Sequence, residues 1–283
     1  MAVLADNAYG KSGIRLVRVE RSTARHQLRD WTVAVRFRGA YEAAYLAGDN
    51  TGVLPTDTMK NTVYAFAKER PFGEPEDFAL ALSEHFLAGN AEARSVEIEI
   101  VERPWTRLGG SATPHAHSFT PDALRRHAWA ARTREQVTTR AGVSEMVLLK
   151  TTESGFSDFR RDRYTTLPET GDRILATTVE ATWEYAQPPA DYAAAWSDVR
   201  QALEASFTSH FSRSVQETIW ILGNAALGAC SALDWIHLRL PNLHHLPVDL
   251  SPFGLDGRGE VFVATSAPYG LIEGTVRRDA VRS

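Results

Sequence analysis

The stretch "IRLVRVERSTARHQLRDWTVAVRF", residues 14–37, decides how the fold of this chain is interpreted. Its two ends, 14–20 and 31–37, alternate apolar and polar side chains, which is the period of a half-buried strand. Because few residues separate these runs, we expect them to pair as antiparallel neighbours. The sequence therefore opens with a strand pair.

Helical patterns follow this strand pair, and strands then return. One helix is expected over 57–68. A second is expected from Pro75, which suits a first helical position, to Gly89 as its C-terminal cap. The second half of the chain repeats the order of strand pair, helix pair and strand pair. The remaining expected elements are strands at 95–102, 125–139 (the weaker candidate), 144–152, 173–186, 235–240, 260–265 and 270–276, and helices over 215–229 and over 192–207, the latter opened by Asp191.

Strand pairs and helix pairs in blocks indicate an α+β fold, with the helices on one face of an antiparallel sheet. The join between the two halves lies near 140–144, so we expect an N-terminal domain over 1–140 and a C-terminal domain over 141–283. The uncovered sheet face needs a partner. Packing between chains could close such sheets into a barrel and remove their exposed edges, so we expect an oligomer.

Composition narrows the classes of protein that the chain can be. It has 283 residues, of which 43% are hydrophobic and 23% charged, near the average for globular proteins. A net charge of −4 is too balanced for a nucleic-acid binder recognised by charge. The single cysteine, Cys230, excludes an internal disulfide and fits a reducing compartment. No membrane span or secretory signal is recognisable, so we expect a cytoplasmic protein.

The stretch "SRSVQETIW", 212–220, is a capping box that begins a helix. Ser214 is the expected cap, and Glu217 stands three residues later. Val215 and Gln216 then occupy the first turn, where unpaired backbone N–H groups and the helix dipole can receive an anion. The side-chain amide of Gln216 can donate and accept hydrogen bonds at once. The same features also fit an ordinary helix start.

The stretch "PTDTMKNTVYAF", 55–66, is a second polar helix start, in which Thr56 or Asp57 can serve as the cap. Lys11 stands just before the first expected strand. Taken alone, these residues also fit capping and an exposed lysine. Their position beside a ligand is therefore a hypothesis that needs further support.

The stretch "RLPNLHHLPVDL", 239–250, follows an expected strand. Asn242 and His244 are two residues apart, so on an extended segment they point the same way. An adjacent histidine pair is a poor metal signal because zinc takes three or four ligands. His115 and His117 are likewise too few, so we expect no metal site.

Arg173 stands at the expected start of a long strand, where its guanidinium fork could clamp a planar anion. Phe156, in the preceding loop, could stack on a flat ring. No glycine-rich dinucleotide loop, P-loop or G-x-S-x-G motif is present. Each of these signals is weak alone, and no dinucleotide-binding fold is indicated.

Taken together, these segments resemble cofactor-independent urate oxidase, the uricase family. The matching stretches span nearly the whole chain in the family's order. They are "YGK" at 9–11, "TARH" at 23–26, "TDTMKNTVYAFAK" at 56–68, "LLKTTESGF" at 148–156, "RDRYTTLPETGDRILAT" at 161–177, "SVQETIW" at 214–220, "LPNLHH" at 240–245, "VDLSPFG" at 248–254 and "PYGLIE" at 268–273.

The resemblance implies the tunnelling fold (T-fold), with two antiparallel-sheet domains in each chain and paired helices on one face. Four chains would build a barrel, as a homotetramer with its sites at subunit interfaces. The implied reaction oxidises urate with O2 and water to 5-hydroxyisourate and hydrogen peroxide, the first step of urate degradation toward allantoin in purine catabolism. It implies no metal or organic cofactor, and O2 is a co-substrate.

The resemblance also assigns roles to residues through the matching motifs. Lys11, Thr56 and His244 match the catalytic proton relay, and Thr56 and Asn242 match the pair that holds O2 or water. The urate-binding positions are Thr56, Asp57, Phe156, Arg173, Val215, Gln216 and Asn242.

The chain departs from the family's pattern at Leu243, where many relatives have lysine, and residues 90–140 match less well. Two other interpretations stay open. One is another purine or pterin enzyme of the same fold, such as a GTP cyclohydrolase or a pterin aldolase. A zinc cyclohydrolase would need a Cys and His cluster, which Cys230 alone cannot supply. The other is a purine-binding protein without activity.

Overall fold

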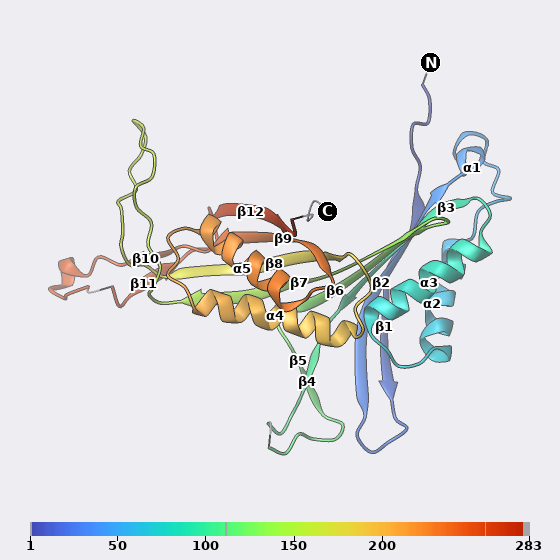
Figure 1. The fold of residues 1–283 in the computed structure, drawn as a ribbon, viewed down its shortest axis with the longest axis horizontal. Coiled ribbons are helices and arrows are strands. Elements are labelled where there is room, and N and C mark those ends of the chain that lie inside the picture. Colours follow the sequence, from blue (N-terminus) through green and yellow to red (C-terminus); the bar gives the residue numbers. More distant parts are fainter. Residues whose placement is uncertain (1, 111, 258, 280–283) are drawn as a thin grey trace. The chain divides into compact units, whose positions relative to one another are not determined.

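The computed structural model describes residues 2–110, 112–257 and 259–279 (Figure 1). The chain forms two compact units. The first consists of Met1–Gly142 with Pro188–Ala193, and the second of Val143–Gln187 with Ala194–Ser283. Antiparallel strands and helices occur in both, so the predicted α+β class is confirmed. The assignment of 1–140 and 141–283 to separate T-fold domains stays a prediction.

The first unit contains an antiparallel sheet whose strands pair in the order β1, β2, β3, β6. Their bounds are β1 (Tyr9–Glu20), β2 (Gln27–Gly39), β3 (Ala93–Glu102) and β6 (Arg125–Thr133). The predicted pairing of 14–20 with 31–37 is confirmed, because Leu16 lies opposite Trp31. The register shifts between Lys11 and Ile14, where Gly13 has a φ of 71°. Glycine accepts this left-handed conformation without a Cβ clash.

Three helices follow β2 in the first unit: α1 (Glu42–Ala47), α2 (Thr56–Glu69) and α3 (Pro75–Gly89). Helix α2 packs against β1, and α3 packs against β3 and β6. The predicted start at Pro75 is confirmed, but Gly89 as the cap was wrong. Gly89 is the last helical residue, and Asn90 ends the helix with a φ of −132°. Its side-chain amide donates to the Phe86 carbonyl (2.6 Å) and so replaces a left-handed glycine cap.

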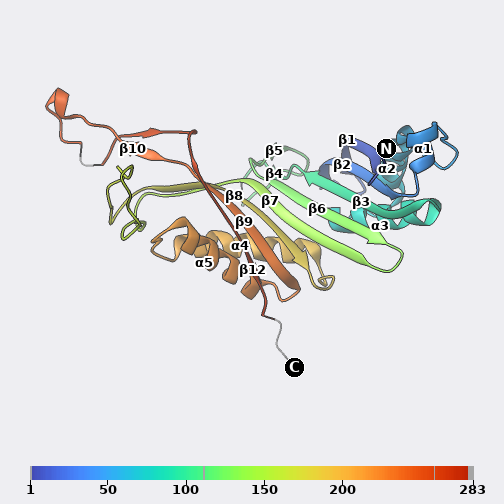
Figure 2. The same cartoon turned by 90° about the horizontal axis from the view of Figure 1, so that it is seen from above.

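The second unit contains an antiparallel group of strands in the order β8, β9, β12. The strand bounds are β8 (Leu175–Tyr185), β9 (Leu233–Asn242) and β12 (Gly270–Arg277), and the helix bounds are α4 (Tyr192–Thr208) and α5 (Val215–Ala229). Strand β7 (Val137–Lys150) contains residues of both units. Helices α4 and α5 lie on the same face of these strands (Figure 2). A Cβ atom on Gly223 would come within 2.4 Å of Val276 Cγ2, so this glycine lets α5 approach β12 closely.

Two strand predictions need correction. The single strand expected over 125–139 is wrong, since β6 ends at Thr133 and β7 begins at Val137. The turn between them is closed by a backbone hydrogen bond from Thr133 N to the Gln136 carbonyl (2.9 Å). The expected strand at 260–265 shortens to β11 (Phe262–Ala264), which pairs with β10 (His245–Pro247). The sequence did not predict that pairing. It also did not predict α1 or the short elements β4 (Trp105–Arg107), β5 (Phe119–Pro121), β10 and η1 (Ser251–Phe253).

None of the helices in the described ranges combines the length and apolar character that a membrane crossing needs. Cys230 is buried and free, as expected for a small apolar side chain.

Candidate active site

Backbone hydrogen bonds hold Phe156 and Arg173 side by side in the second unit. Phe156 and Thr170 exchange N–H···O bonds of 2.8 and 3.0 Å, and Arg173 N donates to the Ser154 carbonyl (2.8 Å). The guanidinium carbon of Arg173 lies 5.3 Å from the centroid of the Phe156 ring. The structure therefore brings the arginine into contact with the ring, and their role in binding a planar ligand stays a prediction.

The guanidinium of Arg173 carries a charge without a compensating partner. Its Nε atom is buried and makes no hydrogen bond within the described residues. Burial lowers the pKa of Arg173, and no described carboxylate offsets that effect. Arginine still stays protonated, so a half-buried cation without an ion-pair partner among the described residues remains. Such a group favours the arrival of an anion that can accept two parallel hydrogen bonds.

Helix α5 begins where the sequence predicted. Ser214 is the cap, in an extended conformation (φ −165°, ψ 162°), and its Oγ accepts a hydrogen bond from Glu217 N (3.1 Å). In a capping box the glutamate carboxylate accepts a hydrogen bond from the backbone N–H of the cap residue. Here the Glu217 carboxylate accepts instead from the backbone N–H of Arg213, the residue before the cap (3.0 Å). Val215 is buried and Gln216 is exposed in the first turn. The positive end of the helix dipole therefore lies at these two residues.

Asn242 ends β9 and lies opposite Thr177 of β8. Leu243 donates its backbone N–H to a carbonyl at the start of β8 (2.8 Å), so this end of β9 is fixed beside the strand that follows Arg173. His244 lies in the short link between β9 and β10, and its carbonyl accepts from Thr265 N (2.9 Å). The prediction that Asn242 and His244 share one side assumed a continuous strand. Strand β9 ends at Asn242, so alternation does not extend to His244.

Helix α2 starts differently from the prediction. Pro55 is the cap residue (φ −56°, ψ 138°) and no side chain caps the helix. Thr56 and Asp57 are its first two helical residues, so the prediction that one of them is the cap was wrong. The Asp57 carboxylate is instead held from within the helix, by Lys60 Nζ and by Asn61 Nδ2 (3.0 Å). The polar helix start therefore presents an ordered carboxylate.

Lys11 acts on this carboxylate electrostatically. The hydrogen bond from Lys60 lowers the pKa of Asp57 below its ordinary value, and the charge of Lys11 lowers it further. Lys11 lies on β1, the strand that α2 packs against. The first unit thus brings Lys11 and Asp57 within electrostatic reach. Lys60 stands three residues after Asp57, a spacing on a helix that is typical of a charge pair.

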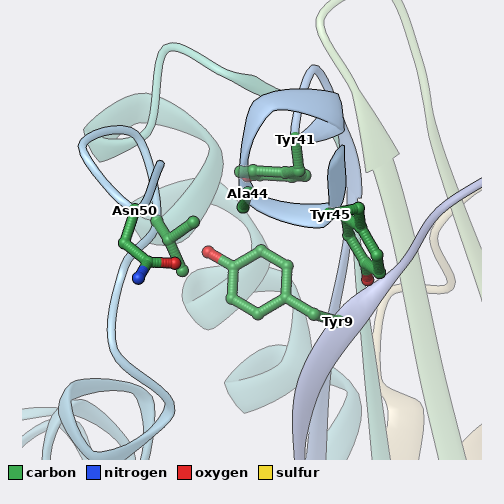
Figure 3. Close-up of a pocket in the computed structure, with 6 residues that line it drawn as sticks. Tyr9, Tyr41, Ala44, Tyr45 and Asn50 are labelled. Carbon is green, nitrogen blue, oxygen red and sulfur yellow. The ribbon is translucent and has the colours of Figure 1, made fainter. Parts of the chain in front are cut away.

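A tyrosine-lined cavity of about 180 Å³ lies in the first unit, and residues of the segment that leads to α2 line part of it (Figure 3). Tyr9, Tyr41 and Tyr45 contribute to its walls together with Ala44, Asn50 and Val53. The Tyr9 hydroxyl accepts a hydrogen bond from Leu54 N (3.0 Å). Tyr9 therefore holds the backbone just before α2. Sequence reasoning missed it, although it belongs to the "YGK" stretch at 9–11.

Metal ligands do not gather in the part of the chain that the structure describes: no group of three or more His, Cys, Asp or Glu side chains there could hold an ion. His115 and His117 have ring centroids 4.5 Å apart, and both are exposed.

The fold is α+β, and its second unit contains a guanidinium in contact with an aromatic ring, together with a helix that begins at Val215. The family model "Uricase" matches residues 7–128 and 139–273. The chain belongs to the uricase family, and the resemblance seen in the motifs is confirmed.

Relatives and solved structures agree with this assignment. The chain is 42% identical to the uricase of Arthrobacter globiformis, over 99% of this chain and 92% of that protein, and 36% identical to the uricase of Dictyostelium discoideum over the whole of both. A crystal structure of the Arthrobacter globiformis uricase superposes with a TM-score of 0.95 at 41% identity, covering 100% of this chain and 97% of that one. Urate oxidase from Bacillus sp. TB-90, at 21% identity, a TM-score of 0.84 and coverage of 96% and 100%, shows the shared fold.

Proposed function

We propose that two groups of residues bind urate and direct its oxidation. One consists of Phe156, Arg173, the start of α5 and the end of β9, and the other consists of Lys11, Thr56 and Asp57. As a member of the uricase family, the chain is an oxidoreductase that converts urate, O2 and water into 5-hydroxyisourate and hydrogen peroxide. Urate gives up two electrons, O2 accepts them and becomes peroxide, and water supplies the new hydroxyl group. Binding, proton transfer and O2 placement each require side chains of suitable chemistry.

Arg173 carries the proposal. Its unpartnered buried Nε and its position 5.3 Å from the Phe156 ring suit a flat anion that accepts hydrogen bonds along one edge. Gln216 adds a neutral amide to the same edge, and Phe156 stacks on the ring face. The start of α5 at Val215 favours the ligand's negative charge. These four residues would hold urate in one orientation.

Thr56 and Asp57 would hold the opposite edge of urate from a neighbouring subunit, in a homotetramer with its sites at subunit interfaces. Exposed apolar side chains on strands support association between chains. Val17 on β1 is 57% exposed, and Val147 on β7 is 63% exposed. Burying such surface between copies is favourable.

The remaining residues would move protons and hold O2. Lys11, acting through Thr56, would take a proton from bound urate, giving an electron-rich dianion that can reduce O2 directly. Asn242 and Thr56 would hold O2 or water above the ring, and His244 would pass protons to peroxide and from water. The substrate then takes the part that a redox cofactor usually plays, so the proposal includes no metal or organic cofactor. A cytoplasmic location also stays a prediction.

The test is aerobic incubation with urate and a chelator, with loss of urate absorbance, O2 uptake and peroxide measured together. Equal loss of urate and O2 with matching peroxide would support the proposal. An Arg173→Gln variant should bind urate more weakly, whereas Arg213→Gln should not, because Arg213 is 79% exposed. Urate that binds and persists would refute the oxidase assignment for these residues.

A further inference from the structure

A cluster of polar side chains spans the segment before α5 and the first turn of that helix. Its members are His210, Ser212 and Thr218, and the last two have 0% exposure. Thr218 lies one turn into α5, and the other two precede the helix. Buried hydroxyl groups cost free energy unless they are hydrogen-bonded, so the bonds among these side chains constrain the local structure.

Thr218 Oγ1 is the centre of the cluster. It lies 2.7 Å from Ser212 Oγ, 3.2 Å from His210 Nε2 and 3.1 Å from the carbonyl oxygen of the cap residue Ser214. Ser212 Oγ donates to that same carbonyl at 3.1 Å. Both hydroxyl oxygens therefore lie within hydrogen-bond distance of the cap carbonyl of α5.

The partners fix the direction of these bonds. His210 Nδ1 lies 2.6 Å from the Ser206 carbonyl, which can only accept, so Nδ1 carries the proton. In the neutral imidazole Nε2 is then an acceptor, and Thr218 donates its single proton to it. The single proton of Ser212 is left for the Ser214 carbonyl and Thr218 Oγ1, which both accept. Lys150 Nζ donates to the His210 carbonyl (2.6 Å) and so holds the backbone of the cluster from another side.

The backbone of Ser212 ties the same cluster to the loop that carries the aromatic ring of the site. Ser212 N donates to the Glu153 carbonyl (2.9 Å), and Gly155 N donates to the Ser212 carbonyl (2.8 Å). Ser154 lies between these two residues and accepts from Arg173 N (2.8 Å). Ser212 is therefore the junction between the start of α5 and both the loop and the arginine.

We propose that the His210–Ser212–Thr218 cluster positions the start of α5 against Phe156 and Arg173, and so sets the width of the urate site. The inference rests on the proposed function, in which Gln216 and the N-terminal end of α5 bind urate. None of the three residues is a catalytic residue. They act through the cap and the loop, and a displacement near 1 Å at a reacting ligand can cost about 100-fold in rate.

The experiment compares Thr218→Val, which removes the hydroxyl at nearly constant volume, with Thr218→Ser, which keeps it. Ser206→Ala is the matched control, since its buried hydroxyl bonds only to carbonyls of its own helix. Each variant is measured for kcat and KM with urate in air, for urate affinity without O2, and for thermal unfolding. We expect Thr218→Val to lower kcat/KM at least tenfold and weaken anaerobic binding. Thr218→Ser and Ser206→Ala should stay within about threefold.

A folded Thr218→Val protein with unchanged kcat/KM and only a lower Tm would overturn the proposal, because the cluster would then serve stability alone. If that variant does not fold, Ser212→Ala decides by the same criteria. Gln216→Ala separates this outcome from failure of the proposed function. If Gln216→Ala leaves urate affinity unchanged, the helix start is not a binding edge and the proposed function fails at that point.

Discussion

Replacing Arg173 with glutamine should weaken urate binding while leaving the folded chain at least as stable. The native guanidinium has a buried Nε without a partner, and burial lowers its pKa. Without ligand, the group therefore costs solvation free energy and gains little in return beyond its contact with the Phe156 ring. With an anionic ligand, that cost is offset by charge-assisted hydrogen bonds.

The magnitude is set by the bonds that are lost. A hydrogen bond to a charged group contributes about 1.5–3 kcal/mol, and a neutral one about 1 kcal/mol. Glutamine can keep one neutral bond where Arg173 would make a bidentate charged pair, so the expected loss is about 2–5 kcal/mol. Since about 1.4 kcal/mol is a tenfold change, the Kd for urate should rise by about 30-fold at the least and by up to about 4,000-fold. The Tm of the free protein should stay level or rise by up to roughly 4 °C.

Anaerobic titration with urate measures the Kd without turnover, and calorimetry of the free protein gives the Tm. Arg213→Gln removes a positive charge near the same helix start and serves as the control, since its exposed pair with Glu217 is worth little. A change in Kd below threefold for Arg173→Gln would refute the proposed binding role. A Tm that falls by many degrees would show that the arginine is a structural ion instead.

Further predictions concern stability, pH and the proton relay. Burial raises the pKa of Glu76 to about 7, so the folded state binds a proton that the unfolded state releases, and stability should fall as the pH rises from about 4.5 to 7. Glu76→Gln should flatten that slope by up to about 1.4 kcal/mol per pH unit in denaturant titrations, and an unchanged slope would contradict the assignment. Tyr9→Phe removes the hydrogen bond from Leu54 N, so the free energy of unfolding from urea titration should fall by about 1 kcal/mol. The kcat/KM for urate should fall as well. Wild-type values for both quantities would exclude a role for the hydroxyl. Leu243→Lys adds a cation beside His244 and should change the pH–rate profile, and an unaltered profile would refute a link between this position and the relay.

Periodicity predicted the long elements because their buried faces repeat along the chain. Alternation located β1 and β2, and the apolar stripe located α5, where buried side chains such as Ile219, Leu222 and Ala226 face the sheet. The cap at Ser214 was also predictable, since a local hydroxyl-to-backbone bond leaves a sequence signature. These features depend on neighbouring residues alone.

Features that depend on distant residues could not be predicted from local patterns. The cap of α2 was misassigned because the Asp57 carboxylate is bound by Lys60 and Asn61 instead of by backbone N–H groups. The short strands β10 and β11 are stabilised by pairing with each other, and a run of three residues has no measurable period. The bridge between Ser154 and Ser212, which organises the site, joins segments with no shared motif.

Gly223 restricts how the sequence of α5 can vary. The helix lies so close to Val276 that an added methyl group at this position would have to displace the helix or the strand. Outside this contact, Trp220 is 62% exposed and Asn224 is exposed. We therefore expect evolutionary drift and engineered diversity to accumulate along the outward face of α5. Position 223 should stay closed to substitution, because a larger side chain would move α5 away from β12 and would shift the start of the same helix, which we propose to bind urate.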